Sequence, residues 1–388
     1  MKILFLSDDF PPQSFGGAGF STFYLARGIQ KAGHQVFVVT TVRHKKEEGG
    51  INYQGLKIFR IYSNYHPRWR AYLSLYNPWT LTRVRELIKE TKPDIVHAHN
   101  IHYYLSYHSL KIAKEISRAV FWTARDTMSF TYGKLATKKY LTQFNPRVSW
   151  WDNLKQAQKR YNPLRNFLIK KYLNYADIKF AVSYALKEAL EENGIRNVEV
   201  NYSGINVDDW QITPAKIEEF KKIHNLQEKK IIFCGGRMNK LKGLKQLEKA
   251  VIKVKEKIAE AFLLIAGKEG IGWLEGEELK TAYWSADVVV VPSLYLDPFP
   301  RVNLEAMACK KPVIGTCFGG TPEIVRDNVT GYIVNPLNIE LMADKIIDLL
   351  KNPQKAKQFG EAGYNLVKTK FSIEKQVDKI LEQYYKFL

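Results

Sequence analysis

Residues 287–316 read "DVVVVPSLYLDPFPRVNLEAMACKKPVIGT", and this stretch decides the fold. A valine run typical of a buried strand leads into a Pro-rich loop that carries Asp297. A helix is predicted from about Arg301 to Cys309, and a second apolar strand follows at 312–316. A strand, loop, helix and strand in this order form the repeating unit of a parallel sheet covered by helices. The same stretch places an acid on the loop and a second acid, Glu305, on the helix.

This strand and helix alternation recurs along the whole chain. The predicted strands are 2–7, 35–41, 94–99, 119–124, 178–183, 230–236, 261–267, 287–293, 312–316 and 331–334. A turn-rich segment at 201–206 separates the first five strands from the last five. We expect an α/β protein with two Rossmann-like, doubly wound parallel-sheet domains that face each other across a cleft.

The predicted domains have unequal lengths. Residues 1–202 form the first domain and 203–371 the second, while 372–388 form a helix that packs back on the first domain. A length of 388 residues suits two domains. Helical periodicity is also predicted at 21–32 and 339–350.

The composition is that of a soluble globular protein, with 45% hydrophobic and 25% charged residues. Disordered and collagen-like classes are excluded. The apolar run at the N-terminus is too short for a signal peptide, and no stretch approaches the roughly 18 to 20 apolar residues of a membrane span. Cys234, Cys309 and Cys317 lack a Cys-x-x-Cys spacing, which favours a reducing, cytoplasmic location and disfavours structural zinc.

A net charge of +20 indicates an acidic partner. Residues 133–171 hold ten Lys or Arg against one acid, Asp152, with six Trp, Tyr and Phe side chains interleaved. This basic/aromatic segment suits the surface of an anionic membrane, so a peripheral position at the inner face of a membrane is one expectation. A solvated helical insertion is the alternative. Net charge alone leaves a basic nucleic-acid-binding protein as a third candidate function, but without a nucleic-acid motif no nucleic-acid partner is expected.

Two loops after predicted strands have phosphate-binding chemistry. In the first, Gly16 and Gly17 allow backbone N–H groups to approach an anion, at the start of a helix. The spacing is not Gly-x-Gly-x-x-Gly, which disfavours a dinucleotide site and leaves a simple tight turn as the alternative. In the second, Arg237 and Lys242 flank a loop and are suited to clamping a diphosphate, unless they are ordinary surface cations.

The loop of the opening stretch adds two carboxylates to this set. The first N–H groups of the predicted helix lack partners within the helix and suit phosphate or sugar hydroxyl groups. A carboxylate accepts two hydrogen bonds from a vicinal diol, so Glu305 suits ribose and Asp297 a hexose. Alternatively, Asp297 caps the turn and Glu305 lies on an exposed helix face.

With these residues in family order, the chain resembles the retaining GT-B glycosyltransferases of family 4. The motifs "AGHQVFVVT", "DIVHAH", "FAVSYALKEAL", "GGRMNKLKG", "ADVVVVPS", "DPFPRVNLEAMACKKPVIGT" and "GGTPEIV" carry the resemblance over nearly the whole chain. It implies a hexosyl-type enzyme that transfers a sugar from a nucleotide-sugar donor, UDP- or GDP-linked, to a glycan or lipid-linked acceptor. It also implies retention of configuration, no catalytic metal and no other cofactor.

The resemblance assigns roles to individual residues. Arg237 and Lys242 bind the diphosphate, Glu305 binds ribose, and Asp297 contacts the donor sugar. The N–H groups of residues 299–302 (Phe299, Pro300, Arg301 and Val302, of which the proline has none) and of Gly16 and Gly17 lie near the donor.

Three departures from the family pattern are visible. Asp297 stands where the family has Glu, and Arg125 stands where it commonly has His. Between 267 and 287 the chain lacks a helix and a strand that normally wall the base pocket. A sugar-nucleotide-binding protein that has lost catalysis is therefore the second candidate.

Three histidines, His97, His99 and His102, lie on or just after one predicted strand. Without Cys or carboxylate neighbours in sequence they make a poor metal site. We expect His99 and Asn100, at the carboxyl end of the strand, to line the acceptor side.

Overall fold

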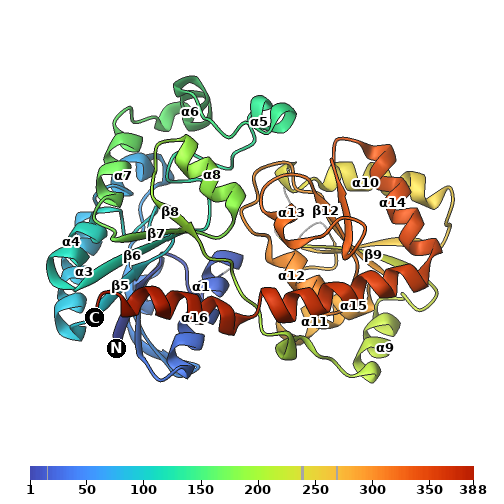
Figure 1. Cartoon of the computed structure of the whole chain (residues 1–388), viewed down its shortest axis with the longest axis horizontal. Coiled ribbons are helices and arrows are strands. Elements are labelled where there is room, and N and C mark those ends of the chain that lie inside the picture. The colour runs from blue at the N-terminus through green and yellow to red at the C-terminus, as the bar shows by residue number, and fades with distance from the viewer. Residues whose placement is uncertain (15, 237–239, 268–269) are drawn as a thin grey trace. The chain divides into compact units, whose positions relative to one another are not determined.

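The computed structural model describes residues 1–14, 16–236, 240–267 and 270–388. Its chain divides into two compact units. Unit 1 comprises Met1–Thr137, Asn145–Gly204 and Ile373–Leu388, and unit 2 comprises Lys138–Phe144 and Ile205–Ser372. Both units are layered α/β structures with helices on the two faces of a sheet (Figure 1).

Unit 1 is built on an eight-stranded sheet. In spatial order the strands are β3 (Gly49–Tyr53), β4 (Leu56–Tyr62), β2 (Gln35–Val42), β1 (Lys2–Leu6), β5 (Ile95–Ala98), β6 (Ala119–Ala124), β7 (Ile178–Ala181) and β8 (Val198–Val200). Every pair is parallel except β3 with β4. The sequence prediction missed β3, β4 and β8, because β3 is polar and largely exposed and β8 has only three residues.

Helices cover both faces of this sheet. They are α1 (Gly17–Lys31), α2 (Arg70–Leu73), α3 (Pro78–Thr91), α4 (His108–Ile116), α6 (Trp150–Ala157), α7 (Arg165–Leu173), α8 (Tyr184–Glu192) and α16 (Ile373–Tyr385), with short 3₁₀ turns η1 (Lys45–Glu47), η2 (Pro67–Trp69) and η3 (Gln158–Arg160). The helix α1 begins at Gly17 and not at the predicted Ser21, because Gly16 already has the extended conformation of an N-cap.

The C-terminal helix α16 packs against α1, and both cover one face of the unit 1 sheet (Figure 1). The two helices approach closely at Gly28, where a Cβ atom would lie 2.5 Å from Val377. The missing side chain therefore lets the end of the chain complete the core of the first unit.

Unit 2 is built on a five-stranded parallel sheet. The strands, in spatial order, are β10 (Ala261–Ala266), β9 (Lys230–Gly235), β11 (Val288–Val291), β12 (Val313–Thr316) and β13 (Gly331–Val334). Its helices are α5 (Lys138–Gln143), α9 (Pro214–Ile223), α10 (Leu244–Lys255), α11 (Gly276–Ser285), α12 (Arg301–Ala308), α13 (Thr321–Ile324), α14 (Ile339–Lys351) and α15 (Pro353–Lys370), with 3₁₀ turns η4 (Val207–Trp210) and η5 (Lys240–Lys242). All five strands were predicted, with ends shifted by one or two residues.

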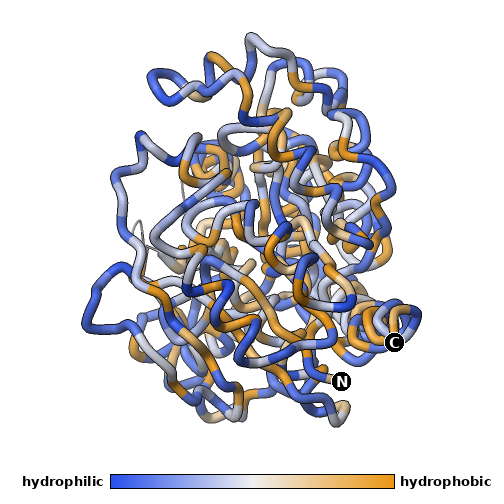
Figure 2. Tube along the Cα trace, turned by 90° about the vertical axis from the view of Figure 1, so that its left-hand side faces the viewer, coloured by the Kyte–Doolittle hydropathy of each residue, from blue (hydrophilic) through white to orange (hydrophobic). Residues whose placement is uncertain are grey.

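Most strands of both units are buried on both faces, as expected when helices cover each side, whereas the edge strand β3 is largely exposed. The surface helices instead alternate hydrophobic and hydrophilic residues along the trace (Figure 2). Within the described part of the chain, no helix is both long and apolar enough to cross a membrane.

Candidate active site

Asp297 lies at the carboxyl end of β11, on the loop that leads into α12. Its side chain is buried, and the Oδ2 atom accepts hydrogen bonds from Lys242 Nζ at 2.7 Å, Tyr295 OH at 2.7 Å and Ser293 Oγ at 3.2 Å. These donors come from the loops after β9 and β11, which are neighbours in the sheet. Because the carboxyl ends of parallel strands meet at one edge, the residues converge where ligands bind in this class of fold.

Lys242 is held in this cluster by charge. Burial alone would lower the pKa of Lys242, but the charge of the Asp297 carboxylate and the hydrogen bonds of Lys242 to Asp297 and Tyr295 outweigh burial and raise the pKa. The ammonium group therefore stays charged. The sequence suggested two exposed surface cations as an alternative for this loop, and for Lys242 that alternative is wrong: only 20% of its side chain is exposed, in an ion pair with Asp297.

Gly243 brings the Lys242 loop against β11. It has φ +75°, and a Cβ atom there would lie 1.9 Å from the carbonyl oxygen of Pro292. The two loops are also joined by the N–H of Leu294, which donates to the Leu241 carbonyl at 2.7 Å. Lys242 and Asp297 are thus placed by backbone packing as well as by their charges.

Glu305 lies one turn into α12 with only 13% of its side chain exposed, so the alternative of an exposed helix face is wrong. Its Oε2 atom accepts from Tyr283 OH at 2.9 Å, and its Oε1 atom accepts from Arg301 Nε at 3.2 Å. Burial and the charge of Glu305 raise the pKa of Tyr283, which keeps the phenol as a hydrogen-bond donor. The carboxylate is therefore already oriented by two donors.

The N-terminus of α12 begins beside these carboxylates. Pro300 is the N-cap residue, and no side chain caps the helix there. Phe299 is buried and packs edge-on against Phe371 at 5.6 Å, while Val302 is half-buried in the first turn. The first N–H groups of a helix can bind an anion, and for the start of α12 this role stays a prediction from the sequence.

A second loop closes on Asp297 from the carboxyl end of β12. Gly319, with φ +68°, lies so close to the Asp297 backbone that a Cβ atom would be 2.2 Å from its carbonyl oxygen. The N–H of Gly320 donates to the same oxygen at 2.9 Å. The hydroxyl of Tyr140, in α5, accepts the N–H of Gly319 at 2.9 Å, and the Tyr140 ring packs on buried Phe318.

Two further sequence predictions concern Arg237 and the segment between β10 and α11. Arg237 lies outside the described residues. Between β10 and α11, the described residues form an isolated bridge between Gly267 and Gly272 and no helix or strand, in agreement with the short connection seen in the sequence.

In unit 1, Arg125 follows β6 and is buried beside His99. Its Nε atom donates to His99 Nδ1 at 3.3 Å, and its Nη1 atom donates to Ser203 Oγ at 2.9 Å. Burial and the nearby charge of Arg125 hold the pKa of His99 well below its usual range, so the ring is neutral. Since Nδ1 accepts, the proton of this neutral ring is on Nε2.

The histidines on and after β5 have different contacts in the structure. His97 is fully buried, and its ring nitrogens bond to Tyr384 OH at 2.6 Å and Thr123 Oγ1 at 2.7 Å. His102 lies 3.5 Å from Asp126. Among the residues that the structure describes, no group of three or more His, Cys, Asp or Glu side chains could hold a metal ion.

The described end of the loop before α1 leads directly into the helix. Gly16 is the N-cap of α1 and Gly17 its first residue, with no side-chain cap. Asn100, half-buried after β5, accepts the Asp8 N–H through its carbonyl at 2.7 Å, which fixes the neighbouring strand end.

Sequence reasoning missed three tyrosines of the unit 2 site. Tyr295 lies two positions before Asp297, so its place on the same loop could have indicated it. Tyr283 lies on α11 and Tyr140 on a distant segment, and neither has a local signal.

The chain matches two known families. Residues 15–209, half of the chain, match Glycosyltransferase Family 4, and residues 269–366 match Glycosyl transferases group 1. An uncharacterized glycosyltransferase of Methanocaldococcus jannaschii is 26% identical, covering 88% of this chain and 87% of that protein. The N-acetyl-alpha-D-glucosaminyl L-malate synthase of Bacillus anthracis is 27% identical over 58% of this chain and 64% of its own length.

Solved structures share the fold. Sucrose-phosphate synthase from Thermosynechococcus elongatus has a TM-score of 0.76 at 20% identity, covering 100% of this chain and 98% of that one. HepE from Anabaena, in complex with UDP-glucose, has a TM-score of 0.72 at 18% identity and covers 100% of both chains. At such identities the likeness establishes the two-domain GT-B fold and nothing finer.

Proposed function

Since the chain belongs to Glycosyltransferase Family 4, we propose that it transfers a hexose from a nucleoside-diphosphate sugar to a glycan or lipid-linked acceptor. The observation that carries this proposal is the buried Asp297 carboxylate held by Lys242 where β11 and β9 end. That HepE was solved with UDP-glucose also supports a nucleotide-sugar donor.

In this proposal unit 2 binds the donor. Lys242 has three N–H donors, so it can keep its bond to Asp297 while another N–H contacts the diphosphate. Its charge would neutralise the negative charge that grows on the leaving group, together with Arg237 and the N–H groups at the start of α12. Asp297 would accept from sugar hydroxyl groups and Glu305 from the ribose diol.

The proposed reaction retains configuration and uses no metal. The bond from the anomeric carbon to the diphosphate oxygen breaks, and the acceptor oxygen bonds to the same face of that carbon. The acceptor proton passes to the departing phosphate oxygen. No protein nucleophile is assigned, and His99 and Arg125 of unit 1 are proposed to line the acceptor side.

A donor panel tests this function. UDP-, GDP- and ADP-sugars are incubated with the protein, and donor hydrolysis and transfer are followed with and without a chelator. The anomeric configuration of the product is read by nuclear magnetic resonance. Asp297→Asn should lower turnover strongly, whereas Asp208→Asn, an exposed acid on η4, is the matched control. Nucleotide-sugar binding without any turnover would instead favour a binding protein that has lost catalysis.

We further propose that unit 1 attaches to an anionic membrane surface through the basic/aromatic segment, 133–171. Its helices α6 and α7 lie at one end of unit 1 (Figure 1). On them, Trp151 is 70% exposed and Phe167 is 67% exposed, although such large apolar side chains are usually buried. Exposed aromatic rings among cations are typical of side chains that insert at lipid headgroups. The seven residues 138–144 belong to unit 2, so this surface comprises only the remainder of the segment.

Vesicle sedimentation tests the attachment. Binding to vesicles of phosphatidylcholine with phosphatidylglycerol should fall with added salt and with Trp151→Ser. Trp273→Ser changes a tryptophan of unit 2 that is 46% exposed and is the control. Equal binding by all three proteins would refute a role for the segment.

A further inference from the structure

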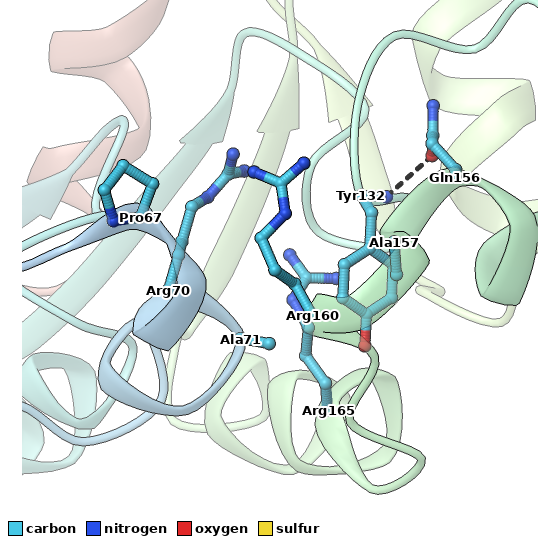
Figure 3. Close-up of a pocket in the computed structure, with 8 residues that line it drawn as sticks. All are labelled: Pro67, Arg70, Ala71, Tyr132, Gln156, Ala157, Arg160 and Arg165. Carbon is cyan, nitrogen blue, oxygen red and sulfur yellow. Dashed lines mark hydrogen bonds between the residues drawn. The ribbon is translucent and has the colours of Figure 1, made fainter.

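A pocket in unit 1 is lined by three arginines (Figure 3). Its lining residues are Pro67, Arg70, Ala71, Tyr132, Gln156, Ala157, Arg160 and Arg165. The cavity volume is about 20 Å³. This is room for one small polar group and far too little for a sugar ring.

The three guanidinium groups lie at different depths. Arg165 is 2% exposed, and its Nη1 atom donates to the Thr131 carbonyl at 3.1 Å. Arg70 is half-buried and Arg160 is exposed. Figure 3 shows the side chains of Arg70 and Arg160 directed toward one another. Positive charge thus extends from the buried floor of the pocket to its opening.

The polar partners of these arginines are neutral. Arg70 donates to Tyr103 OH at 3.1 Å and to the Met128 sulfur at 2.8 Å. The guanidinium of Arg165 lies 4.7 Å from the centre of the Tyr132 ring. Within the described ranges, Arg70, Arg160 and Arg165 form no ion pair with Asp or Glu.

The charge of the pocket is therefore poorly balanced by the protein. Burial lowers the pKa of Arg165, and the charge of Arg70 acts in the same direction. The acid Asp126 acts on Arg165 from a distance, while its own carboxylate contacts His102 and the Met128 N–H. An anion in the pocket would offset both the repulsion and the burial of charge.

The pocket also lies on the ligand-binding side of the unit 1 sheet. Tyr103 and Met128, which Arg70 contacts, follow the carboxyl ends of β5 and β6. Arg125 follows β6 as well. A group bound in the pocket would therefore lie at the same edge as the proposed acceptor side.

We propose that this pocket binds the phosphate group of a phosphorylated acceptor, an assignment of acceptor class that rests on the proposed function. Guanidinium groups match phosphate oxygens in geometry and charge. The small volume admits about one phosphate oxygen, so the phosphate would sit at the opening of the pocket beside Arg70 and Arg160, and the rest of the acceptor would extend outside. The phosphate belongs either to a soluble sugar phosphate or to a lipid.

The test measures phosphate binding by variants that spare the buried Arg165. Titration calorimetry at matched ionic strength uses inorganic phosphate as one probe. Vesicles of phosphatidylcholine, with and without phosphatidic acid, are the other. Arg160→Gln should weaken binding about tenfold, since a charge-assisted hydrogen bond is lost, and Arg70→Gln with Arg160→Gln should weaken it further. Lys171→Gln removes an exposed charge from α7; it should bind inorganic phosphate as the wild type does, and it should lose less vesicle affinity than Arg160→Gln.

Each outcome decides the assignment. Weakening with either probe supports the pocket, and the probe that responds identifies a soluble or a lipid-borne phosphate. No phosphate binding by the wild type, equal affinities in wild type and Arg160→Gln, or an equal loss in Lys171→Gln would overturn it. Nucleotide-sugar binding by the wild type is measured separately. Its absence would refute the proposed function, whereas an Arg160-dependent phosphate site would still stand as an anion site.

Discussion

Lowering the pH from about 7 to about 5.5 should destabilise unit 1 and leave unit 2 nearly unchanged. Three histidines of unit 1, His97, His99 and His102, are buried, and burial holds the pKa of each below its usual range. The pKa of His102 is lowered to about 4. Unit 2 contains one histidine, His224, which directly follows α9.

Proton uptake on unfolding decides whether acid raises or lowers the free energy of unfolding. Between about pH 6.5 and the folded pKa, the unfolded chain binds a proton at each histidine and the folded chain does not, so acid favours unfolding. Over the stated interval each histidine lowers the free energy of unfolding by about 1.2 kcal/mol, which gives about 4 kcal/mol for the three.

Asp8 opposes part of this loss. Burial raises its pKa to about 6, although N–H groups of Leu105, Tyr103 and Tyr104 and the charge of Arg43 act against burial. As the pH falls, the folded state therefore binds this proton before the unfolded chain does. This raises the free energy of unfolding by about 0.8 kcal/mol at about pH 5.5. The expected net loss for unit 1 is about 3 kcal/mol.

Hydrogen exchange with mass spectrometry resolves the two units. Peptides from β1, β5 and β6 should lose about 3 kcal/mol of protection, after correction for intrinsic exchange rates, while peptides from β9 and β11 keep theirs. His102→Gln should reduce the loss by about 1.2 kcal/mol, whereas His224→Gln should not alter it. Equal losses in both units, or unchanged protection in unit 1, would refute the assignment of neutral buried histidines.

Two further predictions concern the unit 2 loops. Lys242→Met should lower the free energy of unfolding by about 3 kcal/mol in urea titrations, because it leaves the buried carboxylate of Asp297 without this partner. Adding Asp297→Asn should restore part of that loss, and an unaltered unfolding curve for the single variant would contradict the buried ion pair. Gly243→Ala should cost more than about 2 kcal/mol, because the new methyl group meets the Pro292 carbonyl, whereas Gly33→Ala, also at positive φ but with no atom within 4 Å, should cost about 1 kcal/mol. Equal costs at the two glycines, by the same titration, would exclude the clash.

Much of the fold was predictable because its signals are local. Apolar runs followed by loops and helices placed all the strands of unit 2 and five of the eight in unit 1. The strand pair β3 and β4 escaped prediction because its outer strand is exposed and contains Gly49 and Gly50, which weakens any alternation of polar and apolar residues. The start of α1 was placed late because Gly17 and Gly19 disfavour a helix by intrinsic propensity.

The candidate site was predictable in part for the same reason. Asp297 and Lys242 follow predicted strands, and adjacent parallel strands bring such loops to one edge. The burial of Glu305 beside Tyr283 was not predictable, because it depends on how α11 packs on α12. Likewise, only the folded chain brings Tyr140 to Gly319.

The sequence by itself determined the alternation of strands and helices, the family motifs and the loops that carry the proposed donor-site residues, because each depends on neighbouring residues or on short spacings. Only the tertiary structure decided that Lys242 is buried in an ion pair, and that Arg70, Arg160 and Arg165 line one pocket. Lys242 is 55 positions from Asp297, and Arg70 is far along the chain from Arg160 and Arg165. Their meeting depends on the packing of whole elements, for which no local pattern of residues codes.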